Sequence, residues 1–253
     1  MKNILIITQD EPFFLYESLG YFFKNLDTSR YYCVCCTLPA SPFGKSESTL
    51  RKAQRTLQIF GLKFFIFYSL KFIYRKYFSK KTLCNVLKKH NIINVDIEGD
   101  INQKSNIDIL KGLRPDLIVS ILGNQIFKSP LLELAPCLNL HTAPLPKYRG
   151  LLPTFWVLKN QEKQTAVSVF LVDEGIDSGP ILVQSVVQLG NKSQLELIRE
   201  TKIIGMKDML RSIDMVMSGN YQTISNNDDF ATYYSFPTRK DVIEFLRKKK
   251  RFF

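Results

Sequence analysis

Histidine and paired cysteine, the common ligands of structural zinc, are scarce in this chain. Its 253 residues include only two histidines and five cysteines, and neither histidine lies near a Cys-x-x-Cys pair, so the ligand spacing of a zinc site is missing. Three cysteines fall in one apolar run, Tyr32-Cys-Val-Cys-Cys-Thr37, and the odd total argues against a disulfide framework. We therefore expect no metal, thiols that fill a buried strand, and a reducing compartment such as the cytoplasm.

Long uncharged hydrophobic runs are also absent, although 45% of the residues are hydrophobic and 12% are aromatic. No run is long enough to span a bilayer, and residues 1–8 are too short and too strand-like for a signal peptide. The length suits one α/β domain with a small appendage. We expect a main domain over residues 1–190 and a C-terminal helix and basic tail over residues 191–253.

Acidic side chains are few relative to basic ones. Lys and Arg number 35 against 23 Asp and Glu, which gives a formal net charge of +12. This excess favours anionic partners such as nucleotides, RNA or an acidic membrane surface, and by itself it selects none of them.

The imbalance is strongest in an insert over residues 45–89, where Glu47 is the only acidic residue among many lysines and arginines. Within it, residues 57–78 mix bases with aromatic rings and predict a helix. Such a helix could make peripheral contact with an anionic membrane, at the inner face of the cell membrane. The alternatives are a helical insertion that packs on the core with its lysines in water, and an RNA-binding surface. The apolar residues occupy too much of the helix circumference for a fully solvated element.

Apolar runs alternate with segments of helical periodicity through the rest of the chain. This alternation predicts a Rossmann-like, doubly wound α/β fold with a mainly parallel sheet. Ligands of such sheets bind at the carboxyl ends of the strands. The predicted strands are residues 3–8, 32–38, 91–96, 116–122 and 137–141, and the predicted helices between them are 13–25, 104–113 and 130–134.

The last part of the chain predicts a long helix over residues 191–218. Asn191 or Ser193 is its candidate N-cap, and Gly219 is a stop signal. The chain then ends in the basic segment 247–253, whose side chains either contact phosphates or simply face the solvent.

Asn139 and His141 lie two residues apart at the end of the last predicted strand, so alternation places both on one face. A polar pair at the mouth of an apolar strand is either a hydrogen-bonded loop closure or part of a reactive site. The segment 172–180 downstream adds Asp177. His90 lies among lysines at a predicted helix end, and we expect it to be a surface residue.

Taken together, Asn139-x-His141, Leu145-Pro146, Gly150 and Asp177-Ser-Gly179 resemble the folate-dependent formyltransferases. That family includes methionyl-tRNA formyltransferase, glycinamide ribonucleotide transformylase and the nucleotide-sugar N-formyltransferases. The likeness runs from about residue 115 to 189 and extends more loosely to residue 1. Thr142 and Pro144 depart from the family's usual loop, where Pro and Leu are common.

The resemblance implies transfer of a formyl group from N10-formyltetrahydrofolate to an amine, with no metal. Asn139 and a protonated His141 would donate to the oxygen on which negative charge develops. Asp177 would orient the imidazole, favour its charged form and relay the proton that the amine loses.

The resemblance also implies a folate site between the segments 122–127 and 173–177. Gly123 and Gly175 suit turns that let the backbone approach a flat pterin, although both also fit ordinary loops. The residues assigned to this site are Leu122, Gly123, Ile126, Asp173, Gly175 and Ile176.

The acceptor is less constrained by the sequence than the donor. The segment of Phe155 and Trp156 is similar to that of the sugar enzymes, whose acceptor is a nucleotide-linked 4-amino sugar. Its diphosphate would suit Lys147, Arg149 or the basic tail, and Trp156 is also assigned to substrate binding. Methionyl-tRNA is a less favoured alternative, because too little chain follows Gly219 for the C-terminal β-barrel of that family.

Other readings stay open. The acceptor could be a lipid-linked amino sugar or a small amine such as glycinamide ribonucleotide, and a homodimer is compatible with the sequence. The chain could also be a folate-binding module without turnover.

Overall fold

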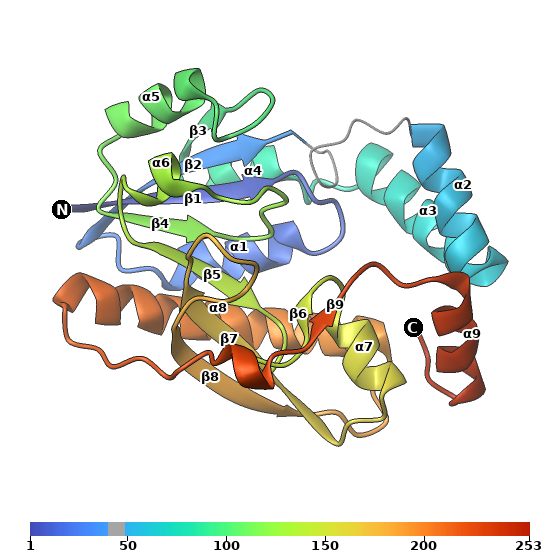
Figure 1. The fold of residues 1–253 in the computed structure, drawn as a ribbon. Helices are drawn as coiled ribbons and strands as arrows, with labels where there is room; N and C mark the ends of the chain where they lie inside the picture. The colour runs from blue at the N-terminus through green and yellow to red at the C-terminus, as the bar shows by residue number, and fades with distance from the viewer. Residues whose placement is uncertain (40–48) are drawn as a thin grey trace.

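The computed structural model describes residues 1–39 and 49–253, and within these ranges a seven-stranded sheet forms the centre of the molecule (Figure 1). Five strands are parallel to one another. At one edge, β7 pairs antiparallel with β5, and β8 pairs antiparallel with β7. In spatial order the strands are β3 (Ile93–Asp96), β2 (Tyr31–Leu38), β1 (Lys2–Gln9), β4 (Leu117–Ser120), β5 (Cys137–His141), β7 (Gln164–Leu171) and β8 (Ile181–Gln188).

Helices cover both faces of the sheet, as predicted for a doubly wound fold. The buried run in β1 explains this arrangement, because Ile4 and Ile6 pack toward one layer while Leu5 and Ile7 pack toward the other. α1 (Leu15–Asn25), α4 (Leu83–Lys89) and α8 (Gln194–Ser218) cover the first face. α5 (Lys104–Gly112) and α6 (Ser129–Leu132) cover the second, and Figure 1 shows the two layers. The predicted mainly parallel α/β fold is confirmed.

The antiparallel pair β7 and β8 was not anticipated from the sequence. β7 follows a short helix, α7 (Pro153–Lys159), and pairs with β5, where Asn139 lies opposite Phe170 and His141 opposite Ser168. The loop between β7 and β8 carries Asp177 back to the end of β5. This pairing is a long-range contact, which local periodicity does not reveal.

The described part of the insert contains α4 and two further helices, where the sequence predicted a single helix over residues 57–78. α2 (Thr49–Phe60) and α3 (Leu62–Tyr77) meet at Gly61, whose φ of +85° breaks the helix predicted over residues 57–78. The first residues of the predicted insert, 45–48, lie outside the described residues. Among the described helices, none is long and apolar enough to cross a membrane.

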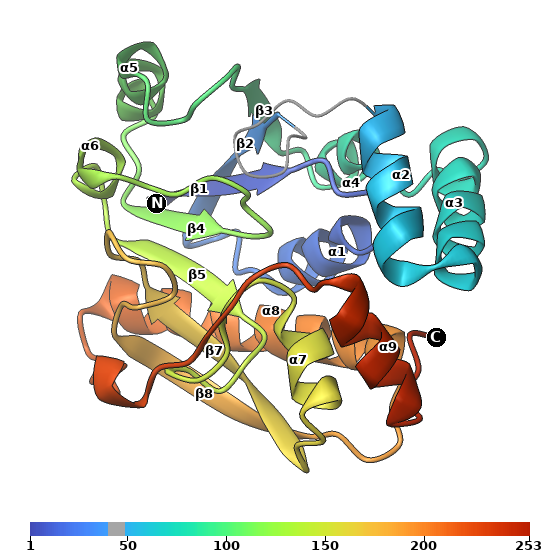
Figure 2. The same cartoon turned by 45° about the vertical axis from the view of Figure 1, so that its right-hand side comes forward.

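The C-terminal segment returns to the core. Tyr233–Tyr234 (β9) pairs with Arg149–Gly150 (β6) in a small second sheet, and α9 (Arg239–Arg247) follows. α9 packs beside α2 and α7, as the two views show (Figures 1 and 2). The side chains of Phe245 and Phe252 are buried, so the basic end of the chain is fastened by aromatic rings while most of its cations remain outside.

The long C-terminal helix has the boundaries that its sequence signals predict. Of the two candidate caps, Ser193 is the N-cap, and its side chain forms a capping box with Glu196. Gly219 ends the helix with a φ of +68°. α8 packs on α1, β5, β7 and β8, so its buried side chains belong to the central core.

Candidate active site

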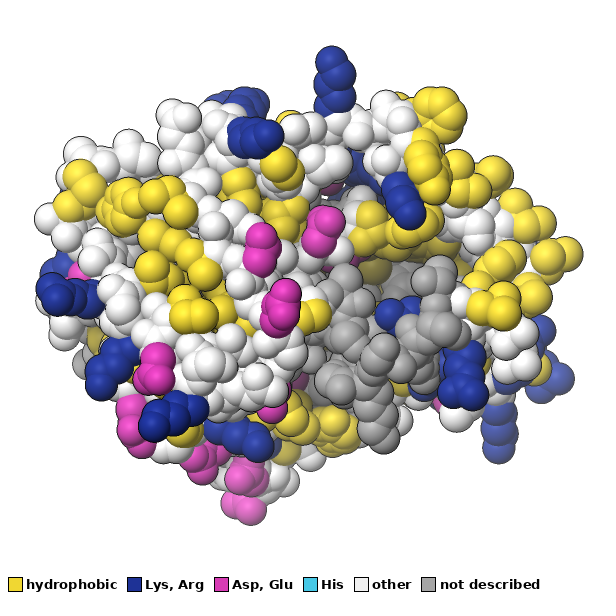
Figure 3. Space-filling model, turned by 90° about the horizontal axis from the view of Figure 1, so that it is seen from above, with side chains coloured by type: hydrophobic (Ala, Val, Ile, Leu, Met, Phe, Trp, Pro, Cys, Tyr) yellow, Lys and Arg dark blue, Asp and Glu magenta, His cyan; other side chains and the backbone are white. Residues whose placement is uncertain are grey.

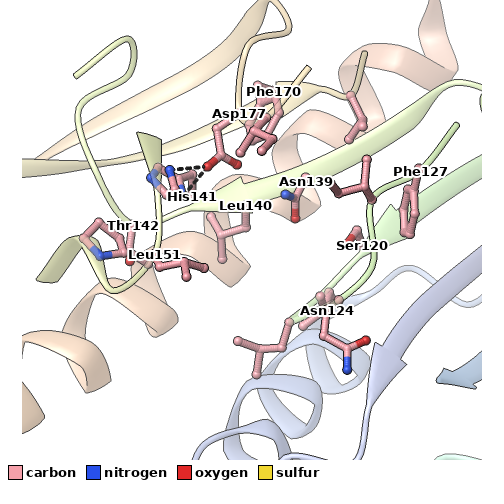
Figure 4. A pocket seen from close by; sticks show the side chains of 18 of the residues that line it. Ser120, Asn124, Phe127, Asn139, Leu140, His141, Thr142, Leu151, Phe170 and Asp177 are labelled. Atoms are coloured by element: carbon pink, nitrogen blue, oxygen red, sulfur yellow. Dashed lines mark hydrogen bonds and ion pairs between the residues drawn. The ribbon is translucent and has the colours of Figure 1, made fainter. Parts of the chain in front are cut away.

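A cavity of about 400 Å³ opens at the carboxyl ends of β4 and β5, the edge where ligands of parallel sheets are expected. Ser120 ends β4, and it pairs with Asn139 on β5. Asn139, His141 and Asp177 all line the cavity (Figure 4). The structure therefore brings the three predicted catalytic residues together, two from one strand and the third from the β7–β8 loop.

Asn139 has a half-buried side chain that faces the cavity. Its amide makes no hydrogen bond to any of the residues that the structure describes, whereas the amides of Asn106, Asn160 and Asn226 are all engaged. An amide at a cavity wall with free N–H groups can donate to an oxygen of a bound ligand. Asn139 thus has the exposure and the free donors that its predicted role requires.

His141 is held between two oxygen acceptors. Its Nε2 lies 2.7 Å from the backbone carbonyl of Tyr148, and its Nδ1 lies 3.5 Å from Oδ2 of Asp177. Each ring nitrogen therefore faces an oxygen that can accept a hydrogen bond from it. Both nitrogens are already engaged in this arrangement. Direct donation from His141 to a ligand oxygen therefore requires the ring to exchange one of these partners.

Asp177 is positioned by its backbone and by its carboxylate. Its φ of +52° is in the left-handed region, which aspartate tolerates better than most residues. Oδ2 accepts a hydrogen bond of 2.8 Å from the backbone N–H of Gly150. The Asn226 side chain donates to the backbone carbonyls of Asp177 and Gly179, at 2.9 and 2.8 Å. These contacts hold the loop so that the carboxylate faces His141.

The six residues assigned to the folate site line the same cavity, namely Leu122, Gly123, Ile126, Asp173, Gly175 and Ile176. Ile126 and Ile176 are notably exposed for aliphatic side chains, at 56% and 43%. A Cβ on Gly123 would lie 2.8 Å from Oγ of Ser120, so a side chain there would require Ser120 to shift. Exposed apolar side chains beside a cavity suit a flat, largely apolar ring.

The three residues assigned to the acceptor do not line this cavity. Arg149 is buried, where its guanidinium pairs with Asp228 at 2.7 Å and donates to the backbone and side-chain oxygens of Asn226 at 3.0 Å. Trp156 is buried and donates from Nε1 to the carbonyl of Ser235. Lys147 is exposed. The structure therefore engages Arg149 and Trp156 in holding the C-terminal segment in place.

Other cavity residues were not singled out from the sequence. Ser18 of α1 and Lys202 and Met206 of α8 line the wall, as does Tyr233 of β9. These residues come from elements far apart in the chain. The one available signal was the pair of bases at Arg199 and Lys202, spaced for one face of α8.

Across residues 1–39 and 49–253, no group of three or more His, Cys, Asp or Glu side chains converges to hold a metal ion. The five cysteines are free thiols, and four of them, including Cys35 and Cys137, are buried. Burial raises the pKa of the Cys35 thiol to about 12, so it stays protonated and packs as a small apolar group.

Comparison with known proteins places this geometry in a family. Residues 79–202 match the family model described as formyl transferase. Residues 79–202 belong to the formyl transferase family. This formyl transferase segment contains β4, β5, β7 and β8, and with them Asn139, His141 and Asp177. The resemblance seen in the sequence is confirmed.

Relatives and solved structures agree on the fold of the formyl transferase segment. A methionyl-tRNA formyltransferase from Kosmotoga olearia is 31% identical over 146 residues, which cover 56% of this chain and 47% of the relative. A sugar N-formyltransferase structure from Shewanella sp. FDAARGOS_354 matches with a TM-score of 0.63 at 17% identity, covering 99% of this chain and 89% of that chain. An N-formyltransferase from Helicobacter canadensis, solved with folinic acid and dTDP-3-aminofucose, matches with a TM-score of 0.59 at 18% identity, covering 98% and 80%.

The chain spans about half the length of the curated relatives that it matches. The structural matches cover nearly all of this chain, including the insert and the C-terminal segment. At these low identities they establish the fold.

Proposed function

We propose that this protein transfers a formyl group from N10-formyltetrahydrofolate to the amine of an anionic small molecule. The observation that carries this proposal is the convergence of Asn139, His141 and Asp177 at one cavity, inside the segment that belongs to the formyl transferase family. We assign the catalytic part to residues 1–190, with residues 191–253 closing the cavity through Lys202, Met206 and Tyr233.

The folate supplies the formyl carbon, and the described cavity residues fit such a donor. The exposed side chains of Ile126 and Ile176 offer an apolar surface for the ring system, and backbone groups near Gly123 and Gly175 are open to it. Leu122 and Asp173 line the same region. We propose these six residues as the folate site.

Asn139 donates from its free amide to the formyl oxygen, where negative charge develops as the amine attacks the carbon. His141 lies between Asp177 and the Tyr148 carbonyl, and in the protonated form that we propose for the reaction it adds positive charge at the same place. The carbon–N10 bond then breaks, N10 of the leaving tetrahydrofolate takes up a proton, and the amine must lose one. Asp177 Oδ1 makes no hydrogen bond to any described residue and is placed to take that proton, directly or through a water.

We favour a nucleotide-linked amino sugar as the acceptor, with a lipid-linked amino sugar as the second form of the same chemistry. Two observations support an amino sugar. The matched structures that cover 98% or more of this chain include sugar N-formyltransferases, and one of them was solved with a nucleotide-linked amino sugar. The alternative acceptors are methionyl-tRNA, which the curated relatives act on according to their names, and glycinamide ribonucleotide.

The test is incubation of the protein with N10-formyltetrahydrofolate and a panel of amino-sugar nucleotides, methionyl-tRNA and glycinamide ribonucleotide, following release of tetrahydrofolate. We expect turnover with an amino-sugar nucleotide. Asn139→Ala should lower that turnover by about 10²–10³-fold, as the loss of one donor to a developing oxyanion does. His141→Ala and Asp177→Ala should also lower it severely while the protein stays folded.

Asp108→Ala is the matched control, because Asp108 is an exposed carboxylate on α5 and its loss should leave turnover unchanged. Folate binding without turnover on any acceptor would instead indicate a binding module.

A further inference from the structure

A second cavity of about 310 Å³ lies between α1, α3 and α8, beside the candidate active site. Ser18 and Lys202 line both cavities, so the two spaces meet at these residues. A ligand that occupies both would place one end near His141 and the other between the helices. The remaining walls of the second cavity are Phe13, Phe14, Glu17, Arg75, Arg199 and Ile203.

Cations dominate this second cavity. Arg75 from α3 and Arg199 and Lys202 from α8 line it. Lys71 lies beside them, with its Nζ 4.8 Å from the ring centre of Phe14 and 5.3 Å from that of Phe13. Burial lowers the pKa of Lys71, and the positive charges of Arg199 and Arg75 lower it further.

The two nearby carboxylates are already engaged. Glu11 accepts hydrogen bonds from the backbone N–H groups of residues 13–15, at 2.9, 2.7 and 3.1 Å. Glu17 accepts from Arg75 Nη2 at 2.6 Å and from Lys81 Nζ at 3.2 Å. Glu11 therefore stabilises the start of α1, and Glu17 pairs with Nη2 of Arg75. The other cations of the cavity make no ion pair to a described residue.

One buried donor on the wall of this cavity and one beside it lack an acceptor among the described residues. Nζ of Lys71 and Nη1 of Arg75 are both buried without a hydrogen-bond partner among the described residues. Burial also lowers the pKa of Lys202 to about 8. Burying charged donors without acceptors is costly, so their retention calls for a ligand that accepts from them. An anion with several oxygens is the chemical match, because arginine and lysine donate to phosphate oxygens.

We propose that the cavity between α1, α3 and α8 binds the diphosphate of the acceptor, while the amine of the acceptor reaches Asn139 and His141 in the adjacent cavity. This inference rests on the proposed function for the identity of the acceptor, and on the residues around the second cavity for the anion. Arg75 comes from the insert, so the insert contributes to substrate binding. A nucleotide-linked and a lipid-linked amino sugar share this diphosphate.

The test is calorimetric binding of inorganic pyrophosphate at low ionic strength to wild type and to Arg199→Gln and Lys202→Gln. We expect each substitution to weaken binding about tenfold, and the double variant about a hundredfold, as the loss of charge-assisted hydrogen bonds does. Lys111→Gln removes an exposed lysine of α5 and should change nothing. Arg199→Lys should restore part of the affinity lost in Arg199→Gln.

Uridine diphosphate and farnesyl diphosphate distinguish the two sources of the diphosphate, because the one that binds more tightly than pyrophosphate indicates which group the acceptor carries. The proposal is overturned if wild type does not bind pyrophosphate, or if the double variant binds it as wild type does. Binding that depends on Arg199 and Lys202 without formyl transfer to any amine would keep this site and remove the proposed function.

A separate observation concerns the outer face of α3. Five large apolar side chains recur at helical spacing along it, namely Leu62, Ile66, Leu70, Ile73 and Tyr77, and all are exposed. We call these five residues the α3 stripe. They lie opposite Phe64, Tyr68 and Lys71, which face the core. Figure 3 shows hydrophobic side chains gathered over this end of the molecule, with Lys and Arg side chains at the border.

The charge around the α3 stripe is of one sign. Residues 49–95 contain no Asp or Glu, whereas Lys63, Lys76 and Lys80 are exposed beside the stripe. An anionic lipid surface complements an apolar stripe bordered by lysines, because the side chains enter the acyl boundary while the lysines meet the headgroups. Stacking of two stripes from two copies would bring these lysines together without a carboxylate on α2 or α3 to offset them.

We propose that the α3 stripe lies on an anionic membrane surface. The test is flotation with vesicles of phosphatidylcholine containing phosphatidylglycerol, and with vesicles of phosphatidylcholine alone. We expect wild type to float with the anionic vesicles, and the double variant Leu62→Ser, Leu70→Ser to bind at least tenfold more weakly. Leu246→Ser, which removes an exposed leucine of α9, should bind as wild type.

The membrane proposal is overturned if wild type does not float, or if the double variant floats equally well. It is also overturned if light scattering shows a dimer that the double variant dissociates, since the stripe would then bind a second copy. Circular dichroism establishes that the variants are folded.

Discussion

Side chains of ordinary types acquire their roles here from what surrounds them. Asn139 is able to donate because β5 places it at the cavity and no described residue accepts from its N–H groups. The His141 ring is oriented because a carbonyl and a carboxylate face its two nitrogens. Burial lowers the pKa of Lys202, because the charged form is desolvated there.

Replacing Asp177 by Asn tests the charge of the pair separately from its shape. The amide oxygen still accepts from the Gly150 N–H, but the negative charge that faces Nδ1 of His141 is lost. We expect kcat to fall by about 10²-fold or more, as loss of an acid–base group does, with the affinity for N10-formyltetrahydrofolate almost unchanged. Steady-state kinetics and folate titration measure both quantities, and Asp108→Asn is the control. A kcat near that of wild type would place the proton transfer elsewhere.

Lys202 predicts a pH dependence of anion binding. Its pKa of about 8 means that the ammonium loses its proton as the pH rises from 7 to 9, so affinity for an anion should fall over that range. The other charged groups around this ammonium are Arg75, Arg199, Glu11, Glu17 and Lys71, and burial lowers the pKa of Lys71 as well. A nucleotide sugar is the suitable probe, because its diphosphate does not titrate between pH 7 and 9. Lys202→Arg should flatten the calorimetric profile, and an unchanged slope would exclude Lys202.

At the level of elements, the small sheet of β6 and β9 joins the C-terminal segment to the catalytic loop. Gly150 lies at the centre of this junction. Its backbone N–H donates to Asp177, and the strand that contains it pairs with Tyr233 and Tyr234. Arg149 fastens the same junction through Asp228 and Asn226. The position of the catalytic carboxylate therefore depends on a two-residue strand from the far end of the chain.

Gly150→Ala tests this junction. The glycine has a φ of +96°, and an added Cβ would lie 2.3 Å from the carbonyl oxygen of Tyr234. We expect a loss of about 1–3 kcal/mol in unfolding free energy from the backbone strain, with a larger fall in kcat because Asp177 loses its donor. Urea unfolding and kinetics measure the two effects.

Gly112→Ala is the control, since no atom lies within 4 Å of its added Cβ and alanine at the end of α5 should be neutral or slightly stabilising. Equal kcat values for Gly150→Ala and wild type would show that β6 does not position Asp177.

At the level of the whole molecule, an aromatic cluster joins the insert, the central domain and the C-terminus. The ring of Phe252 lies 4.9 Å from that of Phe64, 4.6 Å from Phe245 and 6.3 Å from Phe155. These four rings come from α3, α7, α9 and the last residues of the chain. The cluster holds α3 against the core, and with it the Arg75 and Lys71 side chains at the second cavity.

Phe252→Ala should therefore destabilise the protein by about 3–5 kcal/mol, the cost of truncating a buried phenylalanine, and should also weaken pyrophosphate binding by loosening α3. Urea unfolding and calorimetry measure the two effects. Phe230→Ala removes a phenylalanine that is 66% exposed and should change stability by less than about 0.5 kcal/mol. If Phe252→Ala lowers the unfolding free energy no more than Phe230→Ala does, the C-terminal end does not hold the insert in place.

The parallel part of the fold was predictable because its information is local. The unbroken apolar run of β1, the Ser193 capping box and the Gly219 stop each act over a few residues, and the structure confirms the elements that they predict. Asn139 and His141 belong to the same class, since alternation within one strand places both on one face.

The tertiary structure alone decided which distant segments meet. The pairing of β7 with β5 brings Asp177 to His141, and the return of the C-terminal chain occupies Arg149 and Trp156, which the sequence had suggested for substrate. The same packing gathers Arg75, Arg199 and Lys202 around one cavity. Local periodicity indicates which face of an element is buried, but it does not indicate the element against which that face packs. The physical reason is that partner choice is set by long-range contacts between complementary surfaces.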